Sequence, residues 1–297
     1  MRILLAPTAE LAQQVVAIAG GYINCIETEY GSVTVRGNLV NLVHHGENSG
    51  NDAPCITKVA QNSYDCLVSH LDLDTLGGIL AIRGDKPESP EFWKAAAYID
   101  VHGPQYLHTF EPDQIDQLNA YWAWASKNPR IRYTEVTDIT DLVIDAYLVI
   151  DDILGGWDIL HDPNKTKWYG IHEDIHWSYL EEGRTWAAEQ LAATQACLVS
   201  ENAKVRYFET EQTFCNGAYL SPVLGVVPCI VSFNKVKGNI TLSFYDDNGG
   251  DAVAIMQKFY GPEAGGRRGI AGTPRNSVYT SDDAQYLVEQ ICKGVIL

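Results

Sequence analysis

Paired cysteines and long apolar runs are both missing from this chain of 297 residues. Its seven cysteines are scattered and none forms a C-x-x-C pair, which argues against a thiolate zinc site and against a disulfide framework. No stretch approaches the roughly 18 apolar residues that span a bilayer, and the N-terminal segment lacks the pattern of a signal peptide. We therefore expect a cytoplasmic protein with no membrane partner.

Basic residues are also scarce. Lys and Arg total 21 against 38 Asp and Glu, which gives a net charge of −17. Sequence-independent binding of long duplex nucleic acid needs many Lys and Arg side chains facing phosphates, so this charge argues against such a partner. A small phosphorylated partner that is held by metal ions and a few arginines remains compatible with it.

Histidine is absent from the last third of the chain. All eight His residues precede residue 177, and residues 1–200 hold 28 acidic but only 12 basic side chains. Residues 201–297 hold 10 acidic and 9 basic side chains. This asymmetry predicts two modules, and the helical periodicity of residues 171–199 marks a connector between them. We place the domains at residues 1–185 and 205–297, with a connector helix at 186–204.

Short apolar stretches alternate with segments of helical periodicity, which is typical of an α/β fold. We expect an N-terminal domain with a mostly parallel sheet and a smaller C-terminal α/β domain with a mixed sheet. Residues 111–126 predict a helix rich in Trp and Tyr, and residues 261–272 predict a Gly-rich loop. The apolar stretches of the N-terminal domain are residues 2–6, 38–43, 64–69, 95–100 and 139–152, the last of which fits either a strand or a buried helix.

The strongest local motif is His70-x-Asp72-x-Asp74, which follows the apolar stretch 64–69. In an extended segment alternate side chains point the same way, so the imidazole and the two carboxylates can converge. One nitrogen and several hard oxygens suit Mn²⁺ or Mg²⁺ better than an ion that prefers thiolates. The alternative interpretation is an acidic loop that caps the following helix.

Three further apolar segments also end in Asp or His. A two-metal centre needs bridging and terminal ligands from several strands, so four such strand ends together favour metal binding. Any one of them by itself could instead be a helix cap or a solvated loop. The three additional groups are the pair His44-His45, Asp100 with His102, and the pair Asp151-Asp152.

A Gly-rich stretch with two arginines lies near the C-terminal end. Glycines allow backbone to approach a ligand closely, and adjacent amides can hold an anion. Arg side chains add charge-assisted hydrogen bonds to phosphate or carboxylate. The residues concerned are Gly265, Gly266, Arg267 and Arg268, and the alternative interpretation is a flexible surface loop.

These motifs together resemble the DHH phosphoesterase family. The run His70-Leu-Asp-Leu-Asp-Thr-Leu-Gly77 is similar to the family's first motif, H-x-D-x-D-G followed by a helix. Residues 240–245, 252–259 and 265–272 are similar to the strand, helix and G-G-G-H-x-x-A-A-G loop that end the family's C-terminal domain. The similar segments cover about a quarter of the chain, in the family's order. The resemblance implies a two-metal domain followed by a substrate-binding domain, and manganese-dependent hydrolysis of a phosphodiester or phosphoanhydride.

The resemblance also implies roles for individual residues. The family's D-H-H triplet is nowhere intact: Asp100-Val-His102 is one candidate for it and Val43-His44-His45 is the other. Gly265, Gly266, Arg267 and Arg268 would contact substrate, with an Arg in place of the family's loop His. His44 and His45 would be catalytic, either as a metal ligand or as a pair that orients phosphate. The implied ligands of two Mn²⁺ ions, for which Mg²⁺ is an alternative, are His70, Asp72, Asp74, Asp100, His102 and Asp152.

A competing motif is His172-Glu173-x-x-His176, which matches the H-E-x-x-H helix of zinc peptidases. In those enzymes the two His bind Zn²⁺ and the Glu acts as a base. The surroundings argue against this interpretation, because the stretch is rich in Trp and no residue marks a third ligand.

Our hypothesis is therefore a manganese-dependent phosphoesterase that hydrolyses a small phosphorylated substrate by means of a metal-activated water molecule. A short oligonucleotide, a nucleotide or a phosphoanhydride would fit, and a homodimer is compatible with the sequence. Two alternatives stay open: a non-catalytic protein of the same fold that binds nucleotide or phosphate, and a zinc peptidase.

Overall fold

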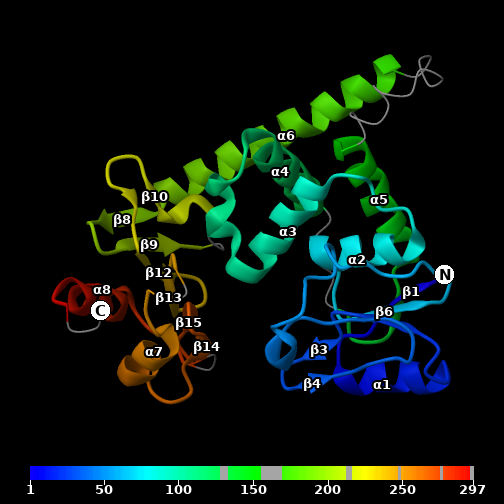
Figure 1. Ribbon diagram of the computed structural model, residues 1–297. Helices are drawn as coiled ribbons and strands as arrows, with labels where there is room; N and C mark the ends of the chain where they lie inside the picture. The colour runs from blue at the N-terminus through cyan, green and yellow to red at the C-terminus, as the bar shows by residue number, and fades with distance from the viewer. Residues whose placement is uncertain (128–132, 155–168, 212–215, 247–248, 275–276, 295–297) are drawn as a thin grey trace. The chain divides into compact units, whose positions relative to one another are not determined.

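The computed structural model describes residues 1–127, 133–154, 169–211, 216–246, 249–274 and 277–294. Its contacts divide the chain into two compact units, drawn with their elements labelled in Figure 1. Unit 1 comprises Met1–Gly103 and His108–Trp186, and unit 2 comprises Pro104–Leu107 and Ala187–Leu297. The prediction of an α/β fold with a mostly parallel sheet and a separate mixed sheet is confirmed.

Unit 1 is built on a five-stranded sheet with the strand order β5-β2-β6-β1-β7. The first four of these strands run parallel to their neighbours, and β7 pairs antiparallel with β1 at one edge. Parallel strands expose their carboxyl ends along one edge of the sheet, which positions the site described below. The strands are β1 (Ile3–Leu5), β2 (Asn24–Ile26), β5 (Asn41–Leu42), β6 (Cys66–Val68) and β7 (Thr137–Asp138).

Helices cover both faces of this sheet (Figure 1). On one face Cys25 and Leu67 pack with Ala12 of α1 (Ala9–Ile18), which begins at the N-cap Thr8. On the other face α2 (Leu73–Arg83) and α5 (Thr140–Leu154) contact β2 and β1, respectively. α3 (Pro90–His102) packs on α2, and α4 (Pro112–Lys127) lies against both α3 and α5. The central strands β2 and β6 are fully buried because both faces of the sheet carry helices.

Two apolar stretches that we counted among the strand ends are helices. Residues 95–100 lie inside α3, which begins with Pro90 in its first turn, and residues 140–152 lie inside α5. α3 contains a run of three alanines, which favour helix, and α5 buries Val143, Ala146 and Ile150 at helical spacing. Asp100, His102 and Asp152 are therefore helical residues. The strand expected at 95–100 was wrong, and at 139–152 the buried helix, one of the two expected alternatives, is the one that forms.

Unit 2 contains a six-stranded mixed sheet with the order β14-β15-β13-β12-β9-β8. β9 and β12 pair in parallel, and the other neighbours are antiparallel. Helices α7 (Ala252–Tyr260) and α8 (Ser281–Cys292) share one core cluster with the sheet. The strands are β8 (Leu198–Glu201), β9 (Arg206–Thr210), β12 (Cys229–Asn234), β13 (Asn239–Phe244), β14 (Gly265–Arg267) and β15 (Ile270–Gly272).

The remaining described elements are short. Two small hairpins pair β3 (Glu29–Tyr30) with β4 (Val33–Thr34) and β10 (Leu220–Ser221) with β11 (Gly225–Val226). Short 3₁₀ helices are η1 (Gly46–Asn48), η2 (Pro104–Thr109) and η4 (Asn216–Tyr219). Among the described residues, no helix is both long enough and apolar enough to cross a membrane.

The connector helix differs from its expected bounds. α6 spans Tyr169–Ala196 and passes from unit 1 into unit 2 between Trp186 and Ala187. We expected helix over 186–204, but Leu198–Glu201 form β8, which pairs with β9 at the edge of the mixed sheet. The pairing with β9 satisfies backbone groups at this edge, which explains why helix stops at Ala196 although the apolar periodicity continues.

Candidate metal centre

Titratable side chains gather at the carboxyl ends of three adjacent strands of unit 1. Glu27 follows β2, His44 and His45 follow β5, and His70 follows β6. Because β5, β2 and β6 are neighbours in the sheet and parallel, their ends meet at one edge. The sequence argument from strand ends therefore holds for these three strands.

Glu27 is the central residue, and it was absent from our sequence-based candidates. Its side chain is fully buried, and its backbone has a positive φ of 49°, which non-glycine residues seldom adopt. Glu27 Oε1 lies 2.7 Å from His44 Nε2, and Oε2 lies 2.8 Å from His70 Nε2. The signal that could have identified it is an acidic residue directly after the short segment Ile-Asn-Cys-Ile at 23–26, which is apolar except for Asn24.

Two aspartates approach the same nitrogen of His44 as Glu27 does. Its Nε2 atom lies 3.2 Å from Asp74 Oδ2 and 3.3 Å from Asp100 Oδ2. Asp74 comes from the first turn of α2, where its Oδ1 accepts a hydrogen bond from the Cys55 amide at 2.7 Å. Asp100 comes from α3. Gly77 of α2 permits this packing, since a Cβ there would lie 2.4 Å from the Cys55 Cβ.

Three buried carboxylate oxygens in this cluster lie within 3.3 Å of an imidazole nitrogen but make no well-oriented hydrogen bond. They are Glu27 Oε2, Asp74 Oδ2 and Asp100 Oδ2. Buried carboxylates whose hydrogen-bonding capacity is incompletely used are costly, so native structures add donors or bind them to cations. Two groups of side chains have ligand atoms close enough together to hold an ion: Glu27, His44, His45 and Asp100, and Glu27, His70 and Asp72.

The ligand types fit a hard or borderline divalent cation. Carboxylate oxygens with imidazole nitrogens, and no thiolate in either group, are the donors that Mn²⁺ and Mg²⁺ accept. Glu27 belongs to both groups and presents one oxygen toward His44 and the other toward His70. The residues present therefore fit the divalent-cation site that the sequence predicts.

The surplus negative charge of the cluster draws protons onto its imidazoles. Burial opposes protonation of His44, but the carboxylates of Asp74 and Glu27 outweigh it and raise its pKa to about 10. Burial likewise opposes protonation of His70, and Asp72 and Glu27 raise its pKa to about 10. Burial, followed by the charges of Asp72 and Glu27, raises the pKa of Asp100 to about 6. The electrostatic potential of the cluster is therefore negative, and it favours the binding of protons or cations.

Asp72 contacts two groups, the His70 ring and the Thr75 backbone amide. Its Oδ2 lies 2.9 Å from His70 Nε2, and its Oδ1 accepts a hydrogen bond from the Thr75 amide at 2.9 Å. The second contact makes Asp72 the N-cap of α2. Ser69 Oγ lies 2.7 Å from His70 Nδ1 and holds the ring from its other side. Both sequence interpretations of the motif, metal ligand and helix cap, are therefore compatible with its geometry.

His102 and Asp152 are not in either candidate metal-binding group among the described residues. Side chains two positions apart on a helix point about 200° apart, so α3 cannot present Asp100 and His102 to one ion as a strand could. The His102 ring packs against Tyr98, with ring centroids 4.2 Å apart. Asp152 lies on α5, where its backbone carbonyl is 3.2 Å from His176 Nδ1.

The Gly-rich stretch in unit 2 is a hairpin and not an open loop. Gly265–Arg267 form the edge strand β14, which pairs antiparallel with β15. A Cβ at Gly266 would lie 2.2 Å from the Ile270 carbonyl oxygen, so strand pairing itself requires glycine there. Arg268 is exposed, and its carbonyl accepts a hydrogen bond from the Ala252 amide at 2.8 Å. The side chain of Arg267 lies outside the described residues.

The H-E-x-x-H motif falls within α6. The side chains of His172 and Glu173 lie outside the described residues, so the structure does not test their convergence. His176 Nδ1 donates to the Asp152 carbonyl of the same unit.

Comparison with known proteins leaves the family open. No family model matches the chain, and no curated protein sequence matches it. One similar solved structure is PggH, a pGpG-specific phosphodiesterase from Vibrio cholerae, with a TM-score of 0.42 and 15% identity over 94% of this chain and 87% of that chain. Another is an uncharacterized protein from Helicobacter pylori G27, with a TM-score of 0.25 and 10% identity over 95% of this chain and 88% of that chain. These likenesses are too distant to assign a family or an activity.

Proposed function

We propose that the protein is a phosphoesterase of the DHH type that depends on divalent metal ions and hydrolyses a small phosphorylated substrate. The observation that supports this proposal is the crowding of buried oxygens of Glu27, Asp74 and Asp100 within 3.3 Å of imidazole nitrogens. The histidines form no well-oriented hydrogen bond with these oxygens. These side chains lie at the carboxyl edge of a parallel sheet, where α/β proteins bind ligands.

Two ions would be held by the two groups that share Glu27. His44, His45 and Asp100 would complete one group, and His70 and Asp72 the other, with Asp74 beside His44. Divalent ions bound there would polarise a phosphoryl group and favour deprotonation of a water molecule. Mn²⁺ is our first choice because imidazole and carboxylate ligands occur together, and Mg²⁺ is the alternative.

The two neighbouring histidines have different access to a substrate. The side chain of His44 is 1% exposed, whereas that of His45 is 44% exposed. His44 can therefore act only inside the cluster, where it holds Glu27, Asp74 and Asp100 in place. His45 Nε2 lies 3.7 Å from Glu27 Oε2 and reaches solvent. It would therefore act either as a ligand of the first ion or, when not bound to it, as a group that orients a phosphate or holds a proton for the leaving oxygen.

The substrate class follows from charge. The net charge of −17 opposes long polyanions, so we infer a nucleotide, a short oligonucleotide or a phosphoanhydride. Gly265, Gly266, Arg267 and Arg268 of unit 2 are proposed as phosphate contacts, as the family resemblance implies. Loss of affinity for substrate in Arg268→Ala, with metal content unchanged, would support that assignment.

The test is a metal and activity measurement on matched variants. Wild-type protein, Asp74→Asn and Glu47→Gln are dialysed against Mn²⁺, analysed for metal, and assayed with nucleotides, short oligonucleotides, cyclic dinucleotides and polyphosphate. Glu47 is an exposed acid three residues from His44 and serves as the control. We expect about two Mn²⁺ per chain in wild type and control, as two-metal chemistry requires, and loss of both metal and hydrolysis in Asp74→Asn.

The other outcomes identify the alternatives. Hydrolysis that is equal in Asp74→Asn contradicts the site. Metal or phosphate binding without hydrolysis of any substrate favours the non-catalytic alternative. One zinc ion that is lost in His176→Ala but retained in Asp74→Asn favours the peptidase.

A further inference from the structure

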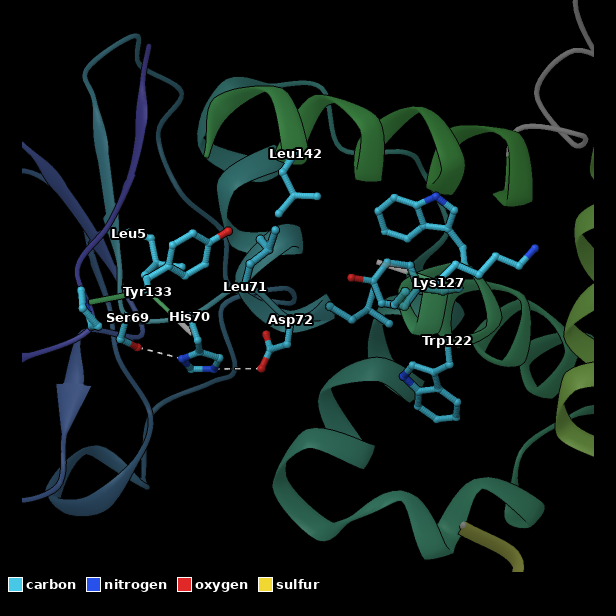
Figure 2. A pocket seen from close by; sticks show the side chains of 14 residues that line it. Leu5, Ser69, His70, Leu71, Asp72, Trp122, Lys127, Tyr133 and Leu142 are labelled. Carbon is cyan, nitrogen blue, oxygen red and sulfur yellow. Dashed lines mark hydrogen bonds and ion pairs between the residues drawn. The ribbon is translucent and has the colours of Figure 1, made fainter. Parts of the chain in front are cut away.

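A pocket of about 540 Å³ opens beside the candidate metal centre, within unit 1. His70 and Asp72, which belong to one of the two candidate metal-binding groups, also line this pocket (Figure 2). Its volume lies within the roughly 300–1,000 Å³ that is usual for small-molecule sites. Whatever fills it therefore sits next to the carboxylate cluster.

Aromatic rings form much of the pocket wall. Helix α4 supplies Tyr121, Trp122 and Trp124, and Tyr133 adds a further ring. Leu5 and Leu142 are among the aliphatic side chains that complete the wall (Figure 2). The metal-site hypothesis gives no role to this concentration of Trp and Tyr on one helix, which the sequence already shows at residues 111–126.

The polar side chains that line the pocket already have hydrogen-bond or ion-pair partners. Ser69, His70 and Asp72 form one hydrogen-bonded chain, drawn as dashed lines in Figure 2. The Lys127 ammonium group pairs with the Glu182 carboxylate. Lys127, the only lysine among the described residues that line the pocket, is already paired. The pocket therefore offers aromatic surfaces for stacking and no unpaired ammonium group, which favours a flat, uncharged ring as ligand.

The geometry points to a nucleobase as the occupant: the pocket binds the base of a substrate whose phosphate lies at the metal centre. The phosphate half of this inference rests on the proposed function, whereas the base half rests on the pocket alone. Aromatic side chains stack on every base because every base has a π-face. We therefore expect broad tolerance among bases and discrimination against phosphates that carry no ring.

The experiment measures nucleoside binding in EDTA, so that neither metal nor hydrolysis contributes. Adenosine, guanosine, cytidine, uridine and ribose are titrated into wild-type protein, Trp122→Ala, Trp122→Phe and Trp177→Ala, using calorimetry. Trp177 is 52% exposed and lies outside the pocket lining, so it is the matched control. Trp122→Phe keeps a stacking face and identifies effects that arise from misfolding of the alanine variant.

We expect nucleosides to bind wild type and Trp177→Ala, while ribose does not. Trp122→Ala should weaken nucleoside binding by roughly five- to 140-fold, the range that one base–aromatic stack contributes, and Trp122→Phe should restore most of it. Absence of nucleoside binding, or equal binding in Trp122→Ala, overturns the inference and leaves the metal proposal intact. Nucleoside binding in a protein that holds no metal and hydrolyses nothing supports the pocket and refutes the phosphoesterase.

A second titration separates the base from other apolar ligands. Octyl phosphate carries a phosphate on an aliphatic chain and no ring. If it binds in EDTA while the nucleosides do not, the pocket accepts alkyl chains and the nucleobase inference is wrong.

Discussion

Glu27 and His44 form a buried pair in which Oε1 lies 2.7 Å from Nε2, and the two side chains are 0% and 1% exposed. They arrive from the ends of neighbouring parallel strands, β2 and β5. Two further carboxylates, Asp74 and Asp100, lie within 3.3 Å of the same Nε2 atom. One imidazole cannot neutralise or hydrogen-bond to three carboxylates at once. The site therefore favours binding of an additional cation.

His44→Ala should lower mainly the stability of the protein, whereas His45→Ala should lower mainly its catalytic rate. His44→Ala leaves Glu27 and Asp74 buried without their imidazole, so we expect a loss of roughly 3–5 kcal/mol in the free energy of unfolding. His45→Ala removes a half-exposed ring and should keep the fold while kcat falls by about 10²–10⁴. Thermal melts and steady-state kinetics with Mn²⁺ measure the two effects. A His45→Ala variant with full kcat would refute the role that we give to this ring.

Metal removal should destabilise unit 1. A ligand that binds only the folded state at about 100 times its Kd adds about 2.7 kcal/mol to the free energy of unfolding. We expect Mn²⁺ to raise the Tm of EDTA-treated protein by several degrees, and to leave Glu27→Gln unchanged. Differential scanning calorimetry gives both values. Equal stabilisation of Glu27→Gln would show that the ion binds elsewhere.

Substitutions at Asp100 and His102 should differ in their effect on metal binding, although the two residues are only two positions apart on α3. Asp100 Oδ2 lies 3.3 Å from His44 Nε2, whereas His102 belongs to neither candidate group among the described residues. Asp100→Asn should weaken Mn²⁺ binding by roughly tenfold or more, and His102→Asn should not change it. Calorimetric titration of metal into the two apo variants decides between them. If His102→Asn loses metal and Asp100→Asn keeps it, the sequence-based ligand set is right at His102 and our geometric assignment is wrong.

Gly183→Ala should destabilise unit 1 by overpacking. A Cβ at Gly183 of α6 would lie 2.4 Å from the Ala120 backbone nitrogen of α4, so the two helices must separate. We expect a loss of roughly 1–3 kcal/mol by urea denaturation. Gly50→Ala is the control, because a Cβ there meets nothing within 4 Å. Equal stability of the two variants would mean that α6 and α4 do not approach so closely.

Arg206→Met should destabilise unit 2 without affecting metal binding. The guanidinium group of Arg206 is fully buried, and it donates to Glu201 Oε2 at 2.9 Å, to Gln195 Oε1 at 2.7 Å and to the Leu220 carbonyl at 2.9 Å. Methionine removes these donors and leaves the Glu201 carboxylate without its buried cationic partner, so we expect a loss of roughly 3–5 kcal/mol. Arg268→Met changes an exposed arginine of the same unit and should be close to neutral. A Tm for Arg206→Met equal to that of Arg268→Met would contradict this account of the buried group.

Several features could be predicted from the sequence because they depend on local pattern. Short apolar runs followed by polar residues predicted the parallel strands β5 and β6, and with them the positions of His44, His45, His70 and Asp72. The acidic and His-rich first part, followed by a nearly neutral second part, predicted two modules and a metal-binding role for the first. These inferences need only the alternation of side chains along a strand and the known preference of hard cations for oxygen and imidazole.

Tertiary structure decided which residues meet. Glu27 follows a strand of only three residues, and its importance comes from the placement of β2 between β5 and β6, which depends on pairing between distant segments. Asp100 reaches the cluster and His102 does not, because the chain there is helical and turns about 100° per residue. The glycines at 265 and 266 are part of a paired hairpin, a contact that spacing alone does not distinguish from a loop. Composition and periodicity thus determine the fold class and the chemistry of the site, whereas strand order and helix packing determine which residues form it.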